Sequence, residues 1–254
     1  MLRDGSASRQ SGIQSTKKTE RTKFPILAAV PLFLLFGAFY IFVTWTAVEP
    51  RYLTALCLSV PCFGLVAVAC LNIRGKASAD VSAVLSVLLI AMFFLGGFGL
   101  LIYLAMDAAT TTTTDVSKYQ RGLRISSLTL EFGCDTFPQA ISDGADEVHF
   151  SYHPAFMMGG EELVLQFKMS DESAEAYQKK FEAQAAWTGN GPNAYSEDYG
   201  VFIGTLSPFD LPADTVVYAI SATPSKENDW NHGKRFLTAV SDSENSVLFY
   251  AERW

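Results

Sequence analysis

The chain has 254 residues, of which 49% are hydrophobic and 18% are charged. That charged fraction lies below the roughly 25% typical of soluble domains, which indicates that part of the chain faces lipid. The formal net charge of −7 divides unevenly: residues 1–107 carry nine Lys/Arg and five Asp/Glu, whereas residues 108–254 carry ten and 21. The acidic second half argues against nucleic acid as a ligand, because the affinity of a protein for nucleic acid depends on neutralising phosphates with Lys and Arg.

Residues 1–23 are polar, rich in Ser and Thr, and show no apolar period, which predicts a disordered basic tail. The first apolar segment follows, from about 24 to 46. It is longer than the roughly 7–15-residue core of a signal peptide, so it predicts an uncleaved transmembrane helix. Glu49-Pro50 then turns the chain, because a residue before proline is pushed out of the α region.

Two further apolar segments cover about 52–71 and 81–106. The second segment carries Pro61 near its middle and is expected to kink there. The third has 26 residues without Asp, Glu, Lys, Arg or His, and at about 1.5 Å per residue it is long enough to cross a hydrocarbon core of about 30 Å. None of the three segments contains Asp, Glu, Lys, Arg or His, which counts against a pump or an ion-coupled transporter.

The distribution of Lys and Arg near these segments predicts the topology. The N-terminal tail has six and the loop 72–80 has two, whereas the opposite side has Arg51, Lys118, Arg121 and Arg124. Basic residues accumulate on the cytoplasmic side, so the N-terminus is expected in the cytoplasm and the C-terminal half outside the cell membrane. That half has a single cysteine, Cys134, and no Asn-x-Ser/Thr sequon, which favours a bacterial protein.

After a threonine-rich stalk over 107–114, residues 115–254 are expected to form an extracytoplasmic α+β domain. Its pattern predicts a mainly antiparallel sheet with one principal helix, which starts at Ser170 and buries residues at helical spacing. Asp115 is expected to cap a short helical turn, and residues 187–195 read as a loop rich in Gly, Asn and Pro. The predicted strands are 123–132, 147–153, 162–169, 199–206, 215–222, 235–240 and 247–252.

No catalytic, cofactor-binding or metal-binding residues are assigned, because the sequence has no Walker loop, nucleophile elbow, H-E-x-x-H motif or paired C-x-x-C. His149 and His153 stand four apart on a predicted strand, which places them about 13 Å apart and too far to share one ion. The acidic stretch 142–147 lacks the spacing of an EF-hand loop and is interpreted as a solvated turn.

The stretch 228–235 is the best candidate for a recognition surface, because Trp and Arg are common anchors of interfaces. The alternative is a plain connection that holds a half-buried Trp. The candidate residues are Asp229, Trp230, His232, Lys234 and Arg235.

Three functions remain open. The favoured one is an uncharacterised multi-pass membrane protein whose acidic domain is a binding module, with the lipid bilayer and a protein or envelope component contacted through residues 115–254 as partners. The second is an envelope enzyme of unknown reaction, and the third is an accessory subunit of a membrane complex. An enzyme would draw on Asp143, Asp146, Glu147, His149, His153 and His232.

Overall fold

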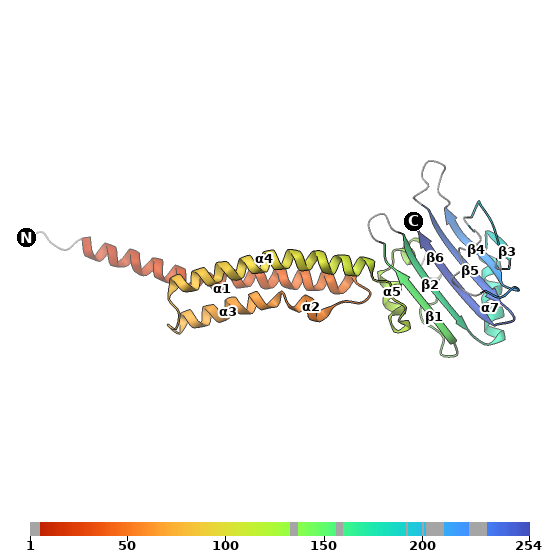
Figure 1. The fold of residues 1–254 in the computed structure, drawn as a ribbon, viewed down its shortest axis with the longest axis horizontal. Coiled ribbons are helices and arrows are strands. Elements are labelled where there is room, and N and C mark those ends of the chain that lie inside the picture. Colours follow the sequence, from red (N-terminus) through yellow and green to blue (C-terminus); the bar gives the residue numbers. More distant parts are fainter. Residues whose placement is uncertain are drawn as a thin grey trace, which may run out of the picture. The chain divides into compact units, whose positions relative to one another are not determined.

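A computed structural model describes residues 6–132, 137–155, 160–191, 193–199, 201, 211–223 and 233–254. The chain forms two compact units (Figure 1). The first consists of Met1–Thr46 and Pro50–Asp107, and the second of Ala47–Glu49 and Ala108–Trp254. Each unit is described separately below.

The first unit is built from apolar helices, as predicted. Three helical segments are long and apolar enough to cross a membrane by length and composition: Pro25–Thr46, Tyr52–Ile73 and Ala79–Thr110. The helices are α1 (Ser6–Thr46), α2 (Tyr52–Leu56), α3 (Ser59–Ile73) and α4 (Ala79–Thr110). Helix α1 begins at Ser6, so residues 6–23, expected to lack regular structure, continue the first helix. Extending a helix that already exists costs far less than nucleating one.

The second apolar segment is broken into α2 and α3, which confirms the expected distortion at Pro61. The break lies at Cys57 and Leu58, between the two helices. Proline lacks an N–H, and its ring clashes with the carbonyl four residues earlier, which here belongs to Cys57. The proline therefore determines where the helix is interrupted.

One ion pair closes an end of the first unit. Arg51 donates from Nε to Asp107 Oδ2 at 2.6 Å and from Nη2 to Oδ1 at 2.9 Å. Paired contacts of this kind fix orientation as well as distance. They hold the residue just before α2 against a residue in the last turn of α4.

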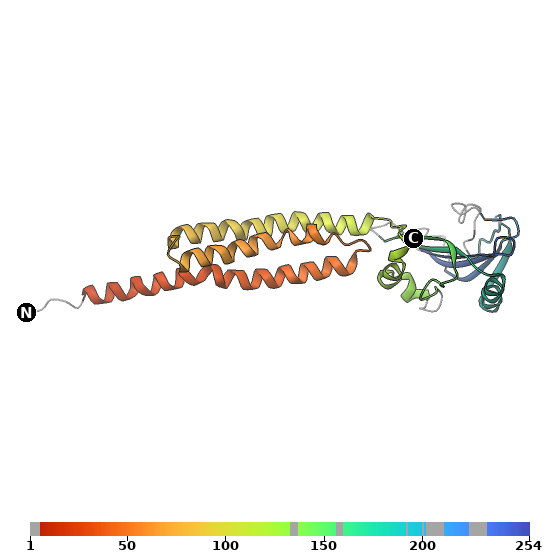
Figure 2. The ribbon, with the colours of Figure 1, turned by 90° about the horizontal axis from the view of Figure 1, so that it is seen from below.

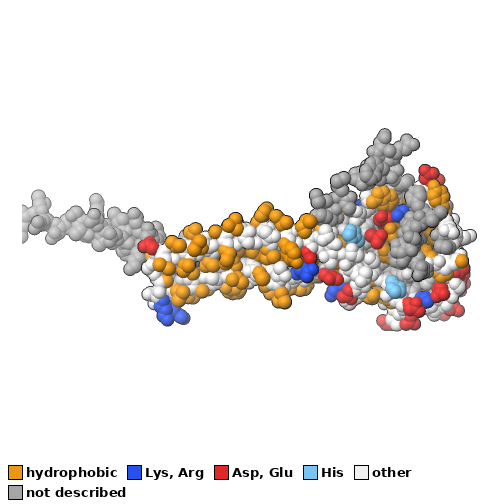
Figure 3. Space-filling model, in the orientation of Figure 1, with side chains coloured by type: hydrophobic (Ala, Val, Ile, Leu, Met, Phe, Trp, Pro, Cys, Tyr) orange, Lys and Arg blue, Asp and Glu red, His pale blue; other side chains and the backbone are white. Residues whose placement is uncertain are grey.

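The apolar side chains of the first unit are largely exposed. Among the described residues, every exposed large hydrophobic side chain except Leu130 and Tyr195 lies between Ile26 and Met106. Figure 3 shows this apolar surface along the helices, in contrast to the mixed surface of the sheet unit. Such a continuous apolar surface far exceeds what soluble proteins tolerate in water.

The second unit contains a six-stranded antiparallel sheet in the order β1-β2-β6-β5-β4-β3, within the part of the chain that is described. Helix α7 (Asp171–Gln184) connects β2 to β3 at the far edge, and the chain then returns strand by strand until β6 pairs with β2. The strands are β1 (Asp146–His153), β2 (Glu161–Lys168), β3 (Trp187–Asn190), β4 (Val216–Thr223), β5 (Lys234–Ser241) and β6 (Ser246–Arg253).

Helices cover one face of this sheet. Figure 2 shows α5 (Tyr119–Ile125) and α7 on the same side. The core on this side is rich in aromatic rings, and Phe249 lies at its centre, 5.5–6.1 Å from the ring centroids of Phe137, Phe167, Tyr177 and Phe181. The opposite face has a smaller core, in which Leu237, Leu248 and Tyr250 pack with Ala194 and Val201. The central strands are therefore buried on both faces.

The predicted strand over 123–132 is wrong. The segment forms α5 and a second short helix, α6 (Leu128–Phe132). The interruption of the alternating pattern at Ser126-Ser127 is the break between two helices: Ser126 is extended, and its hydroxyl accepts a hydrogen bond from the backbone N–H of Leu128 at 3.2 Å. Serine commonly competes for backbone groups in this way and thereby starts or ends helices.

Other predictions have mixed outcomes. Asp115 caps the turn η1 (Val116–Lys118) by accepting from Ser117 N at 2.9 Å, as expected. The stretch expected as a loop after α7 contributes β3, because pairing with β4 overrides the local Gly and Asn. Of the strand predicted over 199–206, Val201 forms an isolated bridge with Ser196, and residues 200 and 202–206 lie outside the described residues.

Truncation of Phe249 should destabilise the second unit strongly. Phe249 is 0% exposed, so Phe249→Ala removes a fully buried ring and leaves a cavity among four others. We expect a loss of about 3–5 kcal/mol in the free energy of unfolding. Denaturant unfolding of the full chain in detergent, followed by aromatic fluorescence, measures this loss. Leu130→Ala, at a side chain that is 81% exposed, is the matched control and should change stability by less than about 0.5 kcal/mol.

Candidate functional site

Charged residues gather at one end of the sheet, where β1 and β6 end and β2 and β5 begin. The strand register places Glu161 opposite Arg253, which in turn lies opposite Lys234. One position along, the partners are His153, Glu162, Glu252 and Arg235. Successive residues of a strand point to opposite faces. We call the first set the helix-side row and the second the loop-side row.

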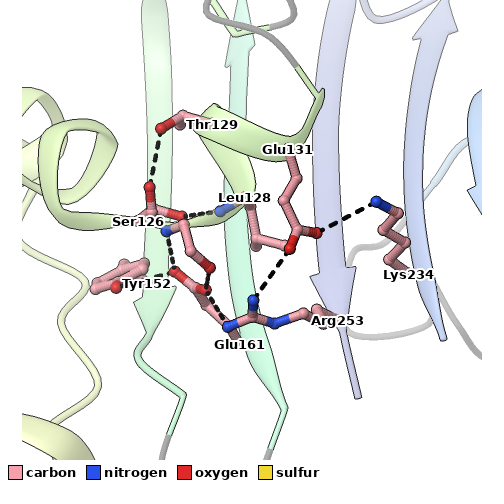
Figure 4. A network of polar contacts seen from close by, with 9 residues as sticks. Ser126, Leu128, Thr129, Glu131, Tyr152, Glu161, Lys234 and Arg253 are labelled. Atoms are coloured by element: carbon pink, nitrogen blue, oxygen red, sulfur yellow. Dashed lines mark hydrogen bonds and ion pairs between the residues drawn. The ribbon is translucent and has the colours of Figure 1, made fainter. Parts of the chain in front are cut away.

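The helix-side row is organised by a buried carboxylate. Glu161 is 2% exposed and accepts hydrogen bonds from the backbone N–H of Ser127 at 3.0 Å, from the Ser127 hydroxyl, and from Tyr152 Oη at 3.2 Å (Figure 4). Arg253 Nη2 completes the set at 3.2 Å. A buried charge is tolerable when it is paired and hydrogen-bonded in this way. Glu161 thereby fixes the start of α6 to the sheet.

Glu131 extends the helix-side row to the solvent. It comes from α6 and lies between two cations, 3.2 Å from Arg253 Nη1 and 3.6 Å from Lys234 Nζ (Figure 4). Lys234 also lies over the Phe132 ring, 5.9 Å from its centroid. These contacts join the C-terminal end of α6 to β5 and β6.

The loop-side row holds a buried guanidinium. Arg235 is 9% exposed, and its Nη2 donates to Glu252 Oε2 at 2.5 Å. Its guanidinium carbon lies 5.0 Å from the Trp254 ring centroid and 5.7 Å from that of Tyr250. Aromatic faces attract cations, and the effect grows when water is excluded. Arg235 is therefore largely buried, and its guanidinium is held by Glu252, Trp254 and Tyr250.

Tyr250 connects two carboxylates of this row. Its hydroxyl lies 2.8 Å from Glu252 Oε2 and 3.2 Å from Glu162 Oε2. Burial raises the pKa of Glu162 above its usual range, the hydrogen bond from Tyr250 opposes that change, and the nearby charge of Glu252 adds to it. Desolvation likewise raises the pKa of Tyr250, so its phenol stays protonated. The folded state therefore favours the protonated form of Glu162.

His153 ends the row on β1, across from Glu162. Its Nδ1 lies 2.7 Å from Thr112 Oγ1. His149 lies on the same strand, four residues earlier, which agrees with the extended spacing expected from the sequence. Within the described residues, no group of three or more His, Cys, Asp or Glu side chains is placed to hold a metal ion.

The structure divides the recognition surface predicted from the sequence. Lys234 and Arg235 are neighbours on β5 and therefore face opposite sides of the sheet, the first in the helix-side row and the second in the loop-side row. Asp229, Trp230 and His232 lie outside the described residues, as does Cys134. Glu147, in the acidic turn, pairs with Lys168 at 3.0 Å and has a backbone φ of 49° where the register of β1 shifts.

Sequence reasoning missed the residues that make up most of the two rows. Glu161-Glu162 lie at the start of an apolar strand and Glu252-Arg253 at the end of one, so each pair reads as the ordinary polar end of a strand. The signal that was available is that two adjacent charges on one strand must face opposite sides. Locating their partners required the register between β2 and β6.

Chemically, the two rows are nearly self-neutralising. Glu131 and Glu161 contact Arg253, and Glu252 contacts Arg235, so these carboxylates are already committed to cations. Such an arrangement stabilises and orients segments, and it presents hydrogen-bonding groups at the end of the sheet. Comparison with protein-family models, with curated proteins and with solved structures finds no match to this chain.

The charge of Glu161 can be tested by a neutral isostere. Glu161→Gln leaves the guanidinium of Arg253 and the Ser127 hydroxyl with a weaker acceptor, so we expect a loss of about 2 kcal/mol in unfolding free energy. Chemical denaturation of the full chain measures it. The matched control is Glu131→Gln, which alters a more exposed contact to the same Arg253 and should cost less than about 1 kcal/mol. Equal losses would contradict the central role of Glu161.

Glu162 should make stability depend on pH in a defined direction. Burial raises its pKa in the folded state, so the folded protein holds this proton to higher pH than the unfolded chain does. Stability then falls as pH rises through the raised pKa and recovers on acidification. Glu162→Gln removes this contribution, so the variant should be more stable at pH 7 and show a flatter pH profile in thermal unfolding. The titratable or charged groups around Glu162 are His153, Arg235, Tyr250 and Glu252.

Proposed function

We propose that the chain is an integral membrane protein that displays an acidic α+β domain as a binding module. Three helices span the bilayer, the N-terminus is cytoplasmic, and the domain lies outside the cell membrane. The partner is a protein or another component of the envelope, contacted through residues 115–254. A bacterial origin fits the single cysteine of that half.

The observation that carries the membrane assignment is the exposed apolar surface of the first unit. Helices that are apolar all round have no stable place in water, whereas lipid solvates them. The lengths agree: Pro25–Thr46 and Tyr52–Ile73 have 22 residues each, close to the roughly 20 needed for a span. An ion pair between Arg51 and Asp107 at the helix ends suits the polar edge of a bilayer.

The polar rows support binding rather than catalysis. A general base or nucleophile has to be available to a substrate, whereas Glu161 and Glu252 are occupied by Arg253 and Arg235. Residues 108–254 carry a net charge of −11. An acidic domain repels anionic surfaces and attracts cationic ones, which favours a partner with cationic groups.

The first test is the accessibility of the second unit to an added protease in intact cells and in lysed cells. We expect digestion of residues 108–254 in intact cells, with the helical unit protected. The control is a cytoplasmic protein in the same cells, which must resist cleavage until lysis. Protection of the domain until lysis would overturn the proposed orientation and place the partner in the cytoplasm.

Partner capture then separates binding from catalysis. We expect crosslinking from residues 115–254 in intact cells to give a discrete adduct. That adduct should survive substitution of His149 and His153 by asparagine, because histidine chemistry is not needed for binding. The envelope enzyme would be favoured if these substitutions abolish the adduct, or abolish conversion of a substrate, while the thermal unfolding of the protein is unchanged.

A further inference from the structure

The short segment that links the first two apolar helices belongs to the sheet domain. Residues Ala47–Glu49 connect α1 to α2 in the sequence, yet they fall in the second unit. Val48 is 1% exposed and is part of the helix-side core, together with Tyr152, Leu163 and Phe249. A residue from a loop more than 50 positions away in the sequence thus completes the core of the domain.

Polar contacts fasten this segment on both sides of Val48. Arg121 donates two hydrogen bonds to the carbonyl oxygen of Ala47, from Nε at 2.9 Å and from Nη2 at 2.7 Å. On the other side, the Thr113 hydroxyl donates to Glu49 Oε1 at 2.5 Å. The two contacts bracket the buried side chain and fix the direction of the segment.

Thr113 joins the segment to the sheet. It is 1% exposed, and its backbone pairs with Tyr152 in both directions, N–H to O at 3.0 Å and O to H–N at 2.9 Å. The threonine run was expected to form a stalk between the last apolar segment and the domain. In the structure α4 continues to Thr110 and Thr113 extends the sheet beyond β1, because its backbone groups find partners there. Hydrogen bonds of Thr113 therefore connect Glu49 to β1.

We propose that residues 108–254 carry a docking site for Ala47–Glu49, and that the domain reaches its full stability only with this segment in place. The segment supplies an apolar side chain, a carbonyl and a carboxylate, and the domain supplies a core position, a guanidinium and a hydroxyl to receive them. The domain is therefore made of two parts of the chain, with three covalent connections to the helical unit: Thr46–Ala47, Glu49–Pro50 and Asp107–Ala108.

This docking constrains topology without using the charge bias. A segment packed inside a domain must lie on the same side of a bilayer as that domain. With the first loop and residues 108–254 on one side, the chain between Pro50 and Asp107 has to cross an even number of times, as α2–α3 and α4 do in the proposed arrangement. The docking itself holds in detergent and does not depend on which side that is.

The test is hydrogen exchange of the full chain in detergent, read at the amides of β1, β2 and β6. Val48→Ala and Arg121→Ala should each raise the exchange of these amides about tenfold, because the open domain becomes more populated. Matched controls are Val60→Ala, at a valine that is 61% exposed, and Arg124→Ala, at an exposed arginine. These controls should stay within about twofold of the parent.

A second pair of variants tests the docking of Ala47–Glu49 even if Val48→Ala fails to fold. Glu49→Gln and Thr113→Val each weaken the same hydrogen bond, so the double variant should exchange about as fast as the faster single variant. Effects that multiply, or Val48→Ala and Arg121→Ala values that match their controls, would overturn the docking. Protease orientation in cells is a separate result, and it can fail while this one holds.

Discussion

The second unit depends above all on aromatic packing around Phe249. This ring comes from β6 and meets Phe167 from β2, Tyr177 and Phe181 from α7, and Phe137 from the segment after α6. Edge-to-face and tilted contacts of this kind add to the free energy of burying each ring. Three segments of the chain are thereby held to β6, and the position of this strand fixes the charged rows at its end.

The two rows show how a small domain places charges at the border of its core. Glu161 and Arg235 are both nearly inaccessible, and each is neutralised by a neighbour across one strand pair. Replacing such pairs with apolar residues is often tolerated in proteins, so their presence says more about which segments are held together than about total stability. Here they specify where α6 begins and how Trp254 lies against β5, which apolar contacts alone would leave less defined.

Much of this fold could be predicted from the sequence, and the failures have physical causes. The long apolar segments and the strands over 147–153, 162–169, 235–240 and 247–252 are local patterns, and these predictions are confirmed by the apolar helices and by β1, β2, β5 and β6. The error at 123–132 arose because two short helices broken at Ser126 imitate an alternating strand. The charged rows and the docking of Val48 depend on pairings between distant segments, which no local pattern encodes.

The position of β6 has a consequence for how the protein is made. The last strand of the sheet is not at an edge but between β2 and β5, so the sheet remains two separate pieces until Arg253 has left the ribosome. Contacts between residues this far apart form slowly, since the intervening chain must first be ordered. During that interval β2 and β5 each expose an open edge, the feature that recruits chaperones or drives aggregation. Completion of the domain therefore waits for β6, and loss of the eight residues of this strand would leave β2 and β5 without a common partner.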